Sequence, residues 1–446
     1  MPRILFPDPI FGHIFFEGIM AELIETAEMT RLRYVKQLAT LYLFYVKAIH
    51  TRYDHSCGMA HLVKGFFDYL PTDILSSIGF EERSITTMAA LVHDTGQPAW
   101  SHSGELFTKF RGFGDQFKHE RVTAELIRNG KKFDKYFNHW GRPRIYEVIN
   151  DQEKLDLIAD VVEGRVPIPR DVPEKDELER RKRFLGQLVS SYCDFDRVEY
   201  LLRDSFFMGS LHTPFSLGLI YANIGIVPAD GANQLGFLNS IFGQSFILTR
   251  ELSYSIFYKD VRDLVAREML ARAWHRVFPK TMDVYELWFS TDEQLLSKLE
   301  GSGDKLAQRI CSMIKSGRIY EIVADMSFRE LDYNARQNLV TLDEDRVKLL
   351  KFEQEIADDL GLSSDDLVVG VHVHPTPVEV NANVLDGNEV HQLGEYTLMK
   401  SLYDPEYCRE RSKLVVGVYH EVNRDLRSEL KKTIIDRLKQ FPGKIS

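Results

Sequence analysis

The chain contains the stretch Leu91-Val92-His93-Asp94-Thr95-Gly96-Gln97-Pro98-Ala99-Trp100-Ser101-His102, in which an apolar run ends in an adjacent His-Asp pair. The apolar run, residues 85–92, predicts a helix that Gly96 and Pro98 terminate. A rigid element that carries one imidazole and one carboxylate, followed by a loop, is typical of a metal site with room for a substrate. The alternative is that His93 and Asp94 form an exposed cap at the C-terminus of the helix. Further candidate ligands elsewhere in the chain are needed to distinguish a metal site from such a cap.

The composition is that of a globular chain with a large core, since 44% of its 446 residues are hydrophobic and 27% are charged. A net charge of -10 gives no indication of a nucleic-acid partner, although the basic clusters 31–33 and 180–183 either meet phosphates or lie on solvated helix faces. The four scattered cysteines exclude a thiolate zinc ribbon and a disulfide scaffold. We expect a cytoplasmic protein without a membrane segment, because the N-terminus lacks a signal-peptide pattern and no apolar run is long enough to cross a bilayer.

The fold class is predicted to be mainly α, with a helical core and a smaller mixed α/β region at the C-terminus. Helical spacing predicts one long helix or two over residues 16–49 and a single long helix over 183–208. Residues 212–248 are richer in Gly, Pro and Asn and predict loop with short strands, such as 246–248. Alternating patterns predict strands at 319–323, 367–374 and 413–420, with helices at 343–360 and 423–439. We therefore divide the chain into a helical domain, 1–290, and a C-terminal helical and α/β region, 291–446.

Four residues are candidate metal ligands: His55, His93, Asp94 and Asp196. A His-Asp pair within an apolar segment needs partners, because a buried carboxylate is costly when it stands alone. Two imidazoles and two carboxylates form a borderline-to-hard donor set, which suits Fe, Mn, Zn, Ni or Mg rather than copper. The sequence thus predicts a divalent metal ion as cofactor.

In the order and flanks of these residues the chain resembles the HD-domain metal-dependent phosphohydrolase superfamily, and within it the dNTP triphosphohydrolases. The resemblance covers at least residues 7–275. The matching segments are 8–12, 31–38, 50–58, 93–102, 196–205 and 250–258. It implies that the four candidates hold the metal ion, that the substrate is a nucleotide, and that the chain forms a homo-oligomer, either a dimer or a tetramer.

The resemblance also implies roles for residues around the metal. His102, Glu105 and His119 match the acid–base cluster of the family, although His119 alone would also be an ordinary helix-start residue. The residues that match contacts to the phosphates, sugar or base are Gln37, Arg52, Arg197, Tyr200, Asp204, Arg250 and Tyr258. For the two tyrosines, simple helix packing is the alternative.

Several positions depart from the family pattern. Gln97, which we also assign to the substrate site, replaces the second histidine of the pattern HDxGH. Asp260 stands where the family has a histidine near the phosphates, and Glu25 and Thr30 replace the aspartate and glutamine of the nucleotide activator site. These residues do not predict activation by GTP.

The predicted activity is the metal-dependent hydrolysis of a (d)NTP to nucleoside and triphosphate. Gln97 and Asp260 leave two alternatives open. One is a phosphomonoesterase or phosphodiesterase that acts on another nucleotide or an oligonucleotide. The other is a nucleotide-binding sensor with impaired catalysis.

Overall fold

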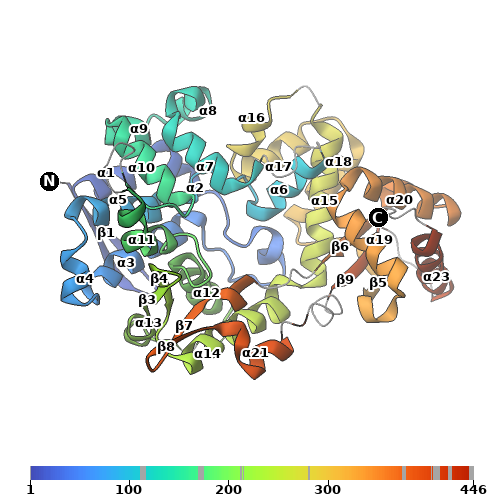
Figure 1. Ribbon diagram of the computed structural model, residues 1–446. Helices are drawn as coiled ribbons and strands as arrows, with labels where there is room; N and C mark the ends of the chain where they lie inside the picture. The colour runs from blue at the N-terminus through green and yellow to red at the C-terminus, as the bar shows by residue number, and fades with distance from the viewer. Residues whose placement is uncertain are drawn as a thin grey trace.

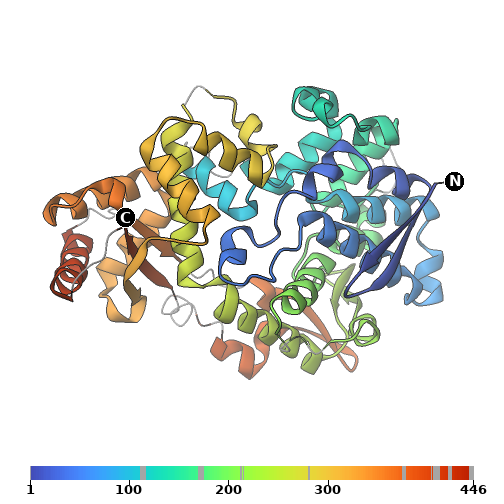
Figure 2. The same ribbon diagram turned by 180° about the vertical axis from the view of Figure 1, so that it is seen from behind.

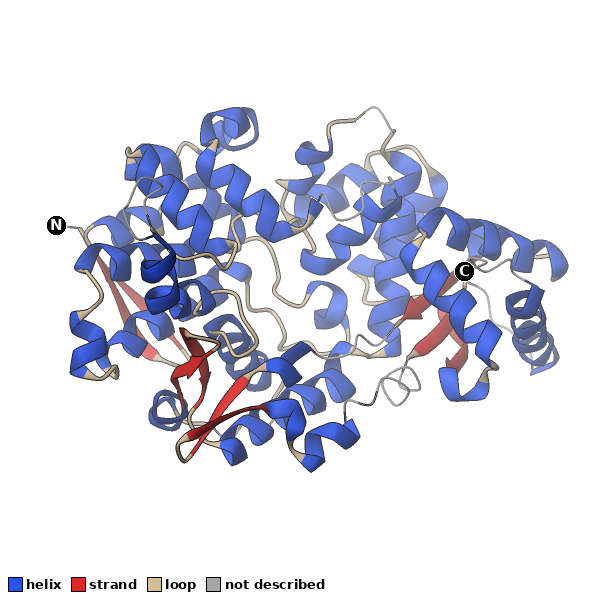
Figure 3. Ribbon diagram, in the orientation of Figure 1, coloured by secondary structure: helices blue, strands red, loops and turns tan. Residues whose placement is uncertain are grey.

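The computed structural model describes residues 2–110, 117–168, 175–210, 213, 215–279, 282–373, 378–402, 404, 412–419 and 424–440. Helices make up most of these residues, and strands form one hairpin and two small sheets (Figure 3). The mainly α fold with a mixed α/β C-terminal region is thereby confirmed. No helix in the described ranges has both the length and the apolar character needed to cross a membrane. The cytoplasmic location and the homo-oligomer stay predictions.

The N-terminal segment begins with an antiparallel hairpin, β1 (Arg3–Asp8) and β2 (Gly12–Glu17). Short helices follow, α1 (Ile19–Leu23) and α2 (Ala27–Leu32), and then the 3-10 helix η1 (Ala39–Leu43). The prediction of one or two long helices over residues 16–49 was therefore wrong. The spacing of apolar residues indicates which residues are buried but not which secondary structure they adopt. In this segment a strand, short helices and turns all bury apolar residues against the same core.

The central helical core places the helices that carry most candidate site residues side by side. Helix α3 packs against α5 and α12, and α10 packs against α5 and α7. The core helices are α3 (Arg52–Asp68), α5 (Phe80–Val92), α7 (His119–Arg128), α10 (Gln152–Val162), α11 (Lys175–Gln187) and α12 (Phe195–Phe207). Around them lie α4 (Thr72–Ser76), α6 (Ser101–Phe110), α8 (Asp134–Phe137), α9 (Ile145–Ile149) and the 3-10 helices η3 (Gly130–Phe133) and η4 (Asn138–Trp140).

The helix predicted over residues 183–208 is divided into α11 and α12. Asp194 causes the new start, because its side chain accepts a hydrogen bond from the backbone N–H of Arg197 and so caps α12. The prediction of one continuous helix was wrong, because Asp194 is not an interior helix residue but the N-terminal cap of a new helix. The division matters for the site, because it places Asp196 in the first turn of α12.

A four-stranded sheet follows the core helices. After α13 (Leu217–Asn223), β3 (Ile224–Ala229) and β4 (Ala232–Phe237) form a hairpin around Asp230 and Gly231, which have positive φ angles of 52° and 69°. The strand predicted at 246–248 was wrong, because these residues lie within α14 (Ser240–Ser253). β4 pairs with β7 (Asn383–Asp386), which pairs with β8 (Glu389–Gln392). Figures 1 and 2 show β7 and β8 beside this hairpin, so the sheet crosses the predicted division at residue 290.

The C-terminal region is built on a three-stranded antiparallel sheet in the order β5 (Glu321–Ser327), β9 (Lys413–Val418), β6 (Leu367–His372). The predicted strands are thus present, and the ends His374 and His420 lie outside the described residues. One face is covered by α19 (Tyr333–Glu344), α20 (Arg346–Asp359) and α23 (Arg424–Gln440). On the other face lie α15 (Val261–Val277), α17 (Asp292–Glu300) and α18 (Lys305–Lys315). Shorter elements are α16 (Val284–Trp288) and α21 (Thr397–Leu402).

Helix α15 is the element that joins this sheet to the helical core (Figure 1). β6 lies so close to α15 that a Cβ added at Gly370 would come within 2.6 Å of Leu264 Cγ. A side chain at residue 370 would push the strand away from the helix. This close packing therefore fixes the position of β6 relative to α15.

Candidate metal centre and substrate cavity

Three helix ends hold the four candidate ligands. Thr51 caps α3 in a reciprocal capping box with Asp54, and His55 extends from the first turn that this box stabilises. His93 is the C-terminal capping residue of α5, and Asp94 follows it. Asp196 comes from the capped start of α12. Because helix ends rather than loops set these positions, the four side chains are held rigidly.

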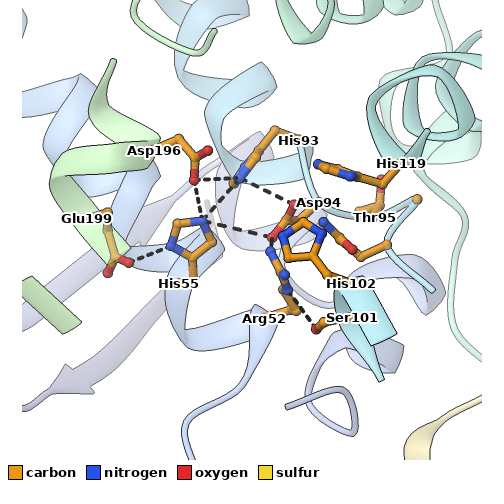
Figure 4. Close-up of polar contacts among 12 residues, drawn as sticks. Arg52, His55, His93, Asp94, Thr95, Ser101, His102, His119, Asp196 and Glu199 are labelled. Carbon is orange, nitrogen blue, oxygen red and sulfur yellow. Dashed lines mark hydrogen bonds and ion pairs between the residues drawn. The ribbon is translucent and has the colours of Figure 1, made fainter. Parts of the chain in front are cut away.

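The four side chains point toward one another (Figure 4). His55 Nε2 lies 3.2 Å from His93 Nε2 and 2.9 Å from Asp196 Oδ1. Asp94 completes the group, 3.9 Å from His55 Nε2 and 3.6 Å from His93 Nε2. Ligand atoms that surround one cation at about 2.0–2.2 Å lie roughly 3–4 Å from each other. The separations therefore suit a single metal ion.

Hydrogen bonds to the outer ring nitrogens also favour a cation between the two imidazoles. His55 Nδ1 lies 2.5 Å from Glu199 Oε2, and His93 Nδ1 lies 2.8 Å from the carbonyl oxygen of Ala90. When each Nδ1 donates its proton to these acceptors, both Nε2 atoms present lone pairs to each other and to two carboxylates. Such a cluster requires a positive charge at its centre. The residues present thus fit a divalent metal ion.

Glu199 is a site residue that sequence reasoning missed. It is fully buried between His55 and Arg203, and Arg203 in turn donates to Asp8 on the N-terminal hairpin at 2.8 Å. Burial lowers the pKa of His55, but the carboxylates of Glu199 and Asp196 outweigh this and raise that pKa to about 10. The same field favours a bound metal cation. The available signal was an acidic residue three positions after Asp196, on the same helical segment as this candidate ligand.

Replacing Glu199 with glutamine is expected to lower metal affinity about 10- to 100-fold, because the amide keeps the shape but removes the charge that orients and polarises His55. Metal titration of the purified variant by calorimetry measures the effect. The matched control is Glu177→Gln on α11, where the side chain is half-exposed and pairs with Arg181. Equal metal affinity in the two variants would contradict the orienting role of Glu199.

A second cluster lies beside the metal centre on α6 and α7. Glu105 bridges two imidazoles, with Oε2 3.1 Å from His102 Nδ1 and Oε1 2.8 Å from His119 Nδ1. The two imidazole rings lie 5.6 Å apart. Burial lowers the pKa of His119, but the hydrogen bond to Glu105 outweighs it and raises that pKa to about 9. A protonated imidazole held beside a metal centre can supply a proton to a leaving oxygen.

The raised pKa of His119 sets the expected pH dependence. Its proton is retained below about pH 9, so activity that needs this proton is present below that pH and is lost as the pH rises through it. In Glu105→Gln the alkaline limb of kcat/KM should move down by about one pH unit or more. Glu120→Gln is the control, because Glu120 lies 3.6 Å from His119 Nε2 and contributes less. An alkaline limb that stays in place in Glu105→Gln would remove His119 from the proton transfer.

The metal centre opens into a cavity of about 470 Å³, a volume typical of small-molecule sites. The predicted site residues that line it are Gln37, Arg52, His93, Asp94, His102, His119, Asp196, Arg197, Tyr200, Asp204, Arg250 and Tyr258. His55 and Glu105 support this wall from behind. Gln97 does not reach the cavity: its side chain is fully buried, and neither atom of its amide has a hydrogen-bond partner among the described residues.

Four arginines line the cavity, and three of them, Arg52, Arg197 and Arg250, are predicted contacts to the substrate. Arg52 donates from Nη1 to Asp94 Oδ2 at 2.8 Å and from Nε to Ser101 Oγ at 3.0 Å, which ties it to the metal centre. Arg197 pairs with Asp194, and Arg250 pairs with Glu251 at 2.9 Å. Together with a bound divalent cation, these guanidinium groups would suit an anionic substrate, although the whole chain is acidic.

Asp204 is held from two sides near the same wall. Its Oδ1 lies 2.8 Å from His50 Nε2, and its Oδ2 accepts a hydrogen bond from the Tyr258 hydroxyl. Residues 254–258 form a single π-helical turn, a feature often found at functional sites. His50 is a second residue that sequence reasoning missed, and its ring stacks on Phe207 at 4.6 Å. His50 and Tyr258 together fix the carboxylate of Asp204, which lines the cavity as a hydrogen-bond acceptor.

One basic residue has a position that neither sequence interpretation anticipated. Arg31 has no exposed surface, and its guanidinium donates to the carbonyl oxygens of Thr95, Gln97 and Ser290 at 3.0, 2.5 and 3.2 Å. It therefore lies neither on a solvated helix face nor among phosphates. Its role is to hold the loop after the His-Asp pair against residues 288–292.

Comparison with known proteins agrees with this geometry. Residues 52–181 match the HD domain family, and residues 243–439 match the family described as the HD associated region. The first match contains His55, His93 and Asp94, whereas Asp196 lies between the two. The chain belongs to the HD-domain phosphohydrolase superfamily.

Within the superfamily the chain is similar to dNTP triphosphohydrolases and to several uncharacterized proteins. It is 28% identical to mouse deoxynucleoside triphosphate triphosphohydrolase SAMHD1 over 221 residues, 46% of this chain and 32% of that protein. It is 30% identical to the uncharacterized protein MG461 homolog of Mycoplasma pneumoniae over 271 residues, 59% of this chain. It is 24% identical to the uncharacterized protein MJ1154 of Methanocaldococcus jannaschii over 452 residues, 97% of this chain and 87% of that protein. The chain spans 58% and 61% of the lengths of the Mycoplasma pneumoniae and Mycoplasma genitalium relatives.

Proposed function

We propose that the protein is a metal-dependent phosphohydrolase that converts a (d)NTP into nucleoside and triphosphate. The observation that carries this proposal is the joint position of the His55, His93, Asp94 and Asp196 group and three arginines around one cavity. Similarity to SAMHD1 proteins, which are named as deoxynucleoside triphosphate triphosphohydrolases, supports the choice of substrate.

The reaction breaks the bond between the α-phosphorus and the 5′ oxygen and forms a bond from water to phosphorus. A bound divalent ion would polarise the α-phosphate and lower the pKa of the attacking water. Arg52, Arg197 and Arg250 neutralise the triphosphate as charge develops on it. His119, protonated through Glu105, delivers a proton to the 5′ oxygen as it leaves.

Contacts on the sugar side orient the nucleoside. Asp204 faces the cavity as an acceptor for a sugar hydroxyl, with Tyr200 and Tyr258 beside it at a ring separation of 6.3 Å. Gln37 lines the same wall. These groups hold the α-phosphate over the metal donors, which is where positioning lowers the barrier most.

The test is product analysis with the purified protein, Fe, Mn, Zn, Ni or Mg, and a panel of deoxynucleotides, ribonucleotides, monophosphates and cyclic dinucleotides. Nucleoside and triphosphate in equal amounts are expected. Release of phosphate from a monophosphate or cleavage of a phosphodiester would assign the alternative esterase activity. Tight nucleotide binding without any product would indicate a sensor. The absence of both product formation and nucleotide binding, with every metal tested, would overturn the proposal.

A further inference from the structure

A polar pair that lines the cavity, Asp263 and Arg267, has no part in the chemistry described above. Asp263 and Arg267 lie one turn apart on α15, and both line the cavity together with His372 at the end of β6. They come from the HD associated region, whereas the metal donors come from the helical core. The close packing of β6 on α15 at Gly370 holds this part of the cavity in place.

One wall of the cavity, which residues 37–41 help to form, connects the pair to the surroundings of the metal centre. At one end of the wall, Ser101 Oγ donates to the carbonyl oxygen of Lys36 at 2.7 Å, and Ser101 accepts from Arg52, which pairs with Asp94. Four residues after Lys36, Thr40 Oγ1 donates to Asp263 Oδ1 at 2.5 Å. Four residues span at most about 14 Å. This upper limit is comparable with the reach from the α-phosphate of a nucleotide to its base.

The wall between the two ends suits a sugar followed by an aromatic base. Gln37 lines it first, and Leu38, Ala39 and Leu41 then present apolar surface. A flat base packs on such surface while its polar edge needs hydrogen-bond partners at the end of the cavity. Asp263 and Arg267 line the same cavity and can provide such partners.

Both members of the pair retain unused hydrogen-bonding capacity. Arg267 Nε lies 3.1 Å from Asp263 Oδ2, but it is buried and has no hydrogen-bond acceptor among the residues that the structure describes. The side chain of Asp263 is only 9% exposed, and burial raises its pKa. Burying an ion pair is costly, and a ligand that supplies further hydrogen bonds offsets part of that cost.

We propose that Asp263 and Arg267 recognise the base of the substrate and that the preferred base is guanine. A carboxylate only accepts hydrogen bonds, and a guanidinium only donates them. Guanine offers two adjacent donors, N1–H and the 2-amino group, next to the acceptor O6. Each of the other bases offers one donor group on this edge, so it makes one hydrogen bond fewer to the carboxylate. This inference rests on the proposed nucleotide hydrolysis.

The experiment compares kcat/KM for dGTP, dITP, dXTP and dATP. The wild-type protein should prefer dGTP over dITP, which lacks the 2-amino group, and over dATP by about ten- to a hundredfold. In Asp263→Asn the preference should change from dGTP to dXTP, because the asparagine amide donates to the 2-oxo group. In Arg267→Gln the rates for dGTP and dITP should fall together, since both present O6, and their ratio should stay constant.

Arg276→Gln is the control, because Arg276 lies farther along the same helix, is half-exposed and pairs with Asp304 and Asp365. It should leave all four rates unchanged. If Asp263→Asn lowers all four rates equally, the pair only supports the fold, and the inference is overturned. Equal rates for all bases in the wild-type protein overturn it as well.

Failure of nucleotide hydrolysis can be distinguished from failure of base recognition. If no nucleotide yields a product with any metal, hydrolysis is excluded, and the binding of dGTP and dITP is then compared by calorimetry. Tighter binding of dGTP that Asp263→Asn abolishes would support base recognition without turnover. Equal binding of both nucleotides would overturn it.

Discussion

Replacing Asp196 with asparagine is expected to remove the bound metal and to lower turnover about a hundred- to ten-thousandfold, because a metal ion supplies several kcal/mol of transition-state stabilisation. Asp196 is the best residue for this test. Its side chain is 36% exposed, whereas those of His55, His93 and Asp94 are nearly or fully buried. The cap of α12 depends on Asp194 and stays intact.

The variant should remain folded, because a proton between His55 and its neighbours can partly replace the missing cation. Metal analysis of the purified protein and nucleotide turnover are measured together, with circular dichroism as a check on folding. Asp68→Asn is the control, since Asp68 lies at the exposed end of the helix that carries His55. Full metal content and full turnover in Asp196→Asn would remove this residue from the metal centre.

Arg31→Met is expected to destabilise the protein by about 3–5 kcal/mol, a larger loss than most single substitutions cause. Methionine fills a similar volume but leaves three buried carbonyl oxygens without donors. The loop after the His-Asp pair would then lose its main link to residues 288–292. We therefore expect weaker metal binding in the same variant, although Arg31 touches none of the four candidate ligands.

The measurement combines thermal unfolding with metal titration. Arg33→Met is the control on the same segment, because Arg33 is partly exposed and pairs with Glu25 at 2.9 Å, an arrangement that contributes less than about 1 kcal/mol. Arg31→Lys should lie between the two, since an ammonium has three donors but lacks the planar fork. Equal unfolding temperatures for Arg31→Met and Arg33→Met would show that the buried arginine does not hold the loop.

The sequence by itself determined the order of the helices with the candidate ligands, the mainly α class and the strands of the C-terminal sheet. Most of the site residues that it named line the cavity, because chemistry of this kind needs specific side chains at helix ends. It failed over residues 16–49, where apolar spacing marks burial without distinguishing helix from strand or turn. It also placed Gln97 at the substrate, whereas this side chain lies within the fold and does not line the cavity.

Only the tertiary structure decided which charged residues serve the site and which serve the fold. Glu199, Arg31 and the pair of Asp263 and Arg267 are ordinary charged residues on helical segments when seen along the chain. The hydrogen-bond partners of Arg31 lie between 64 and 259 residues away along the sequence. His55, the partner of Glu199 in the metal centre, lies 144 residues away. Burial and hydrogen bonding over such separations depend on how the helices pack, which no local pattern of residue types contains.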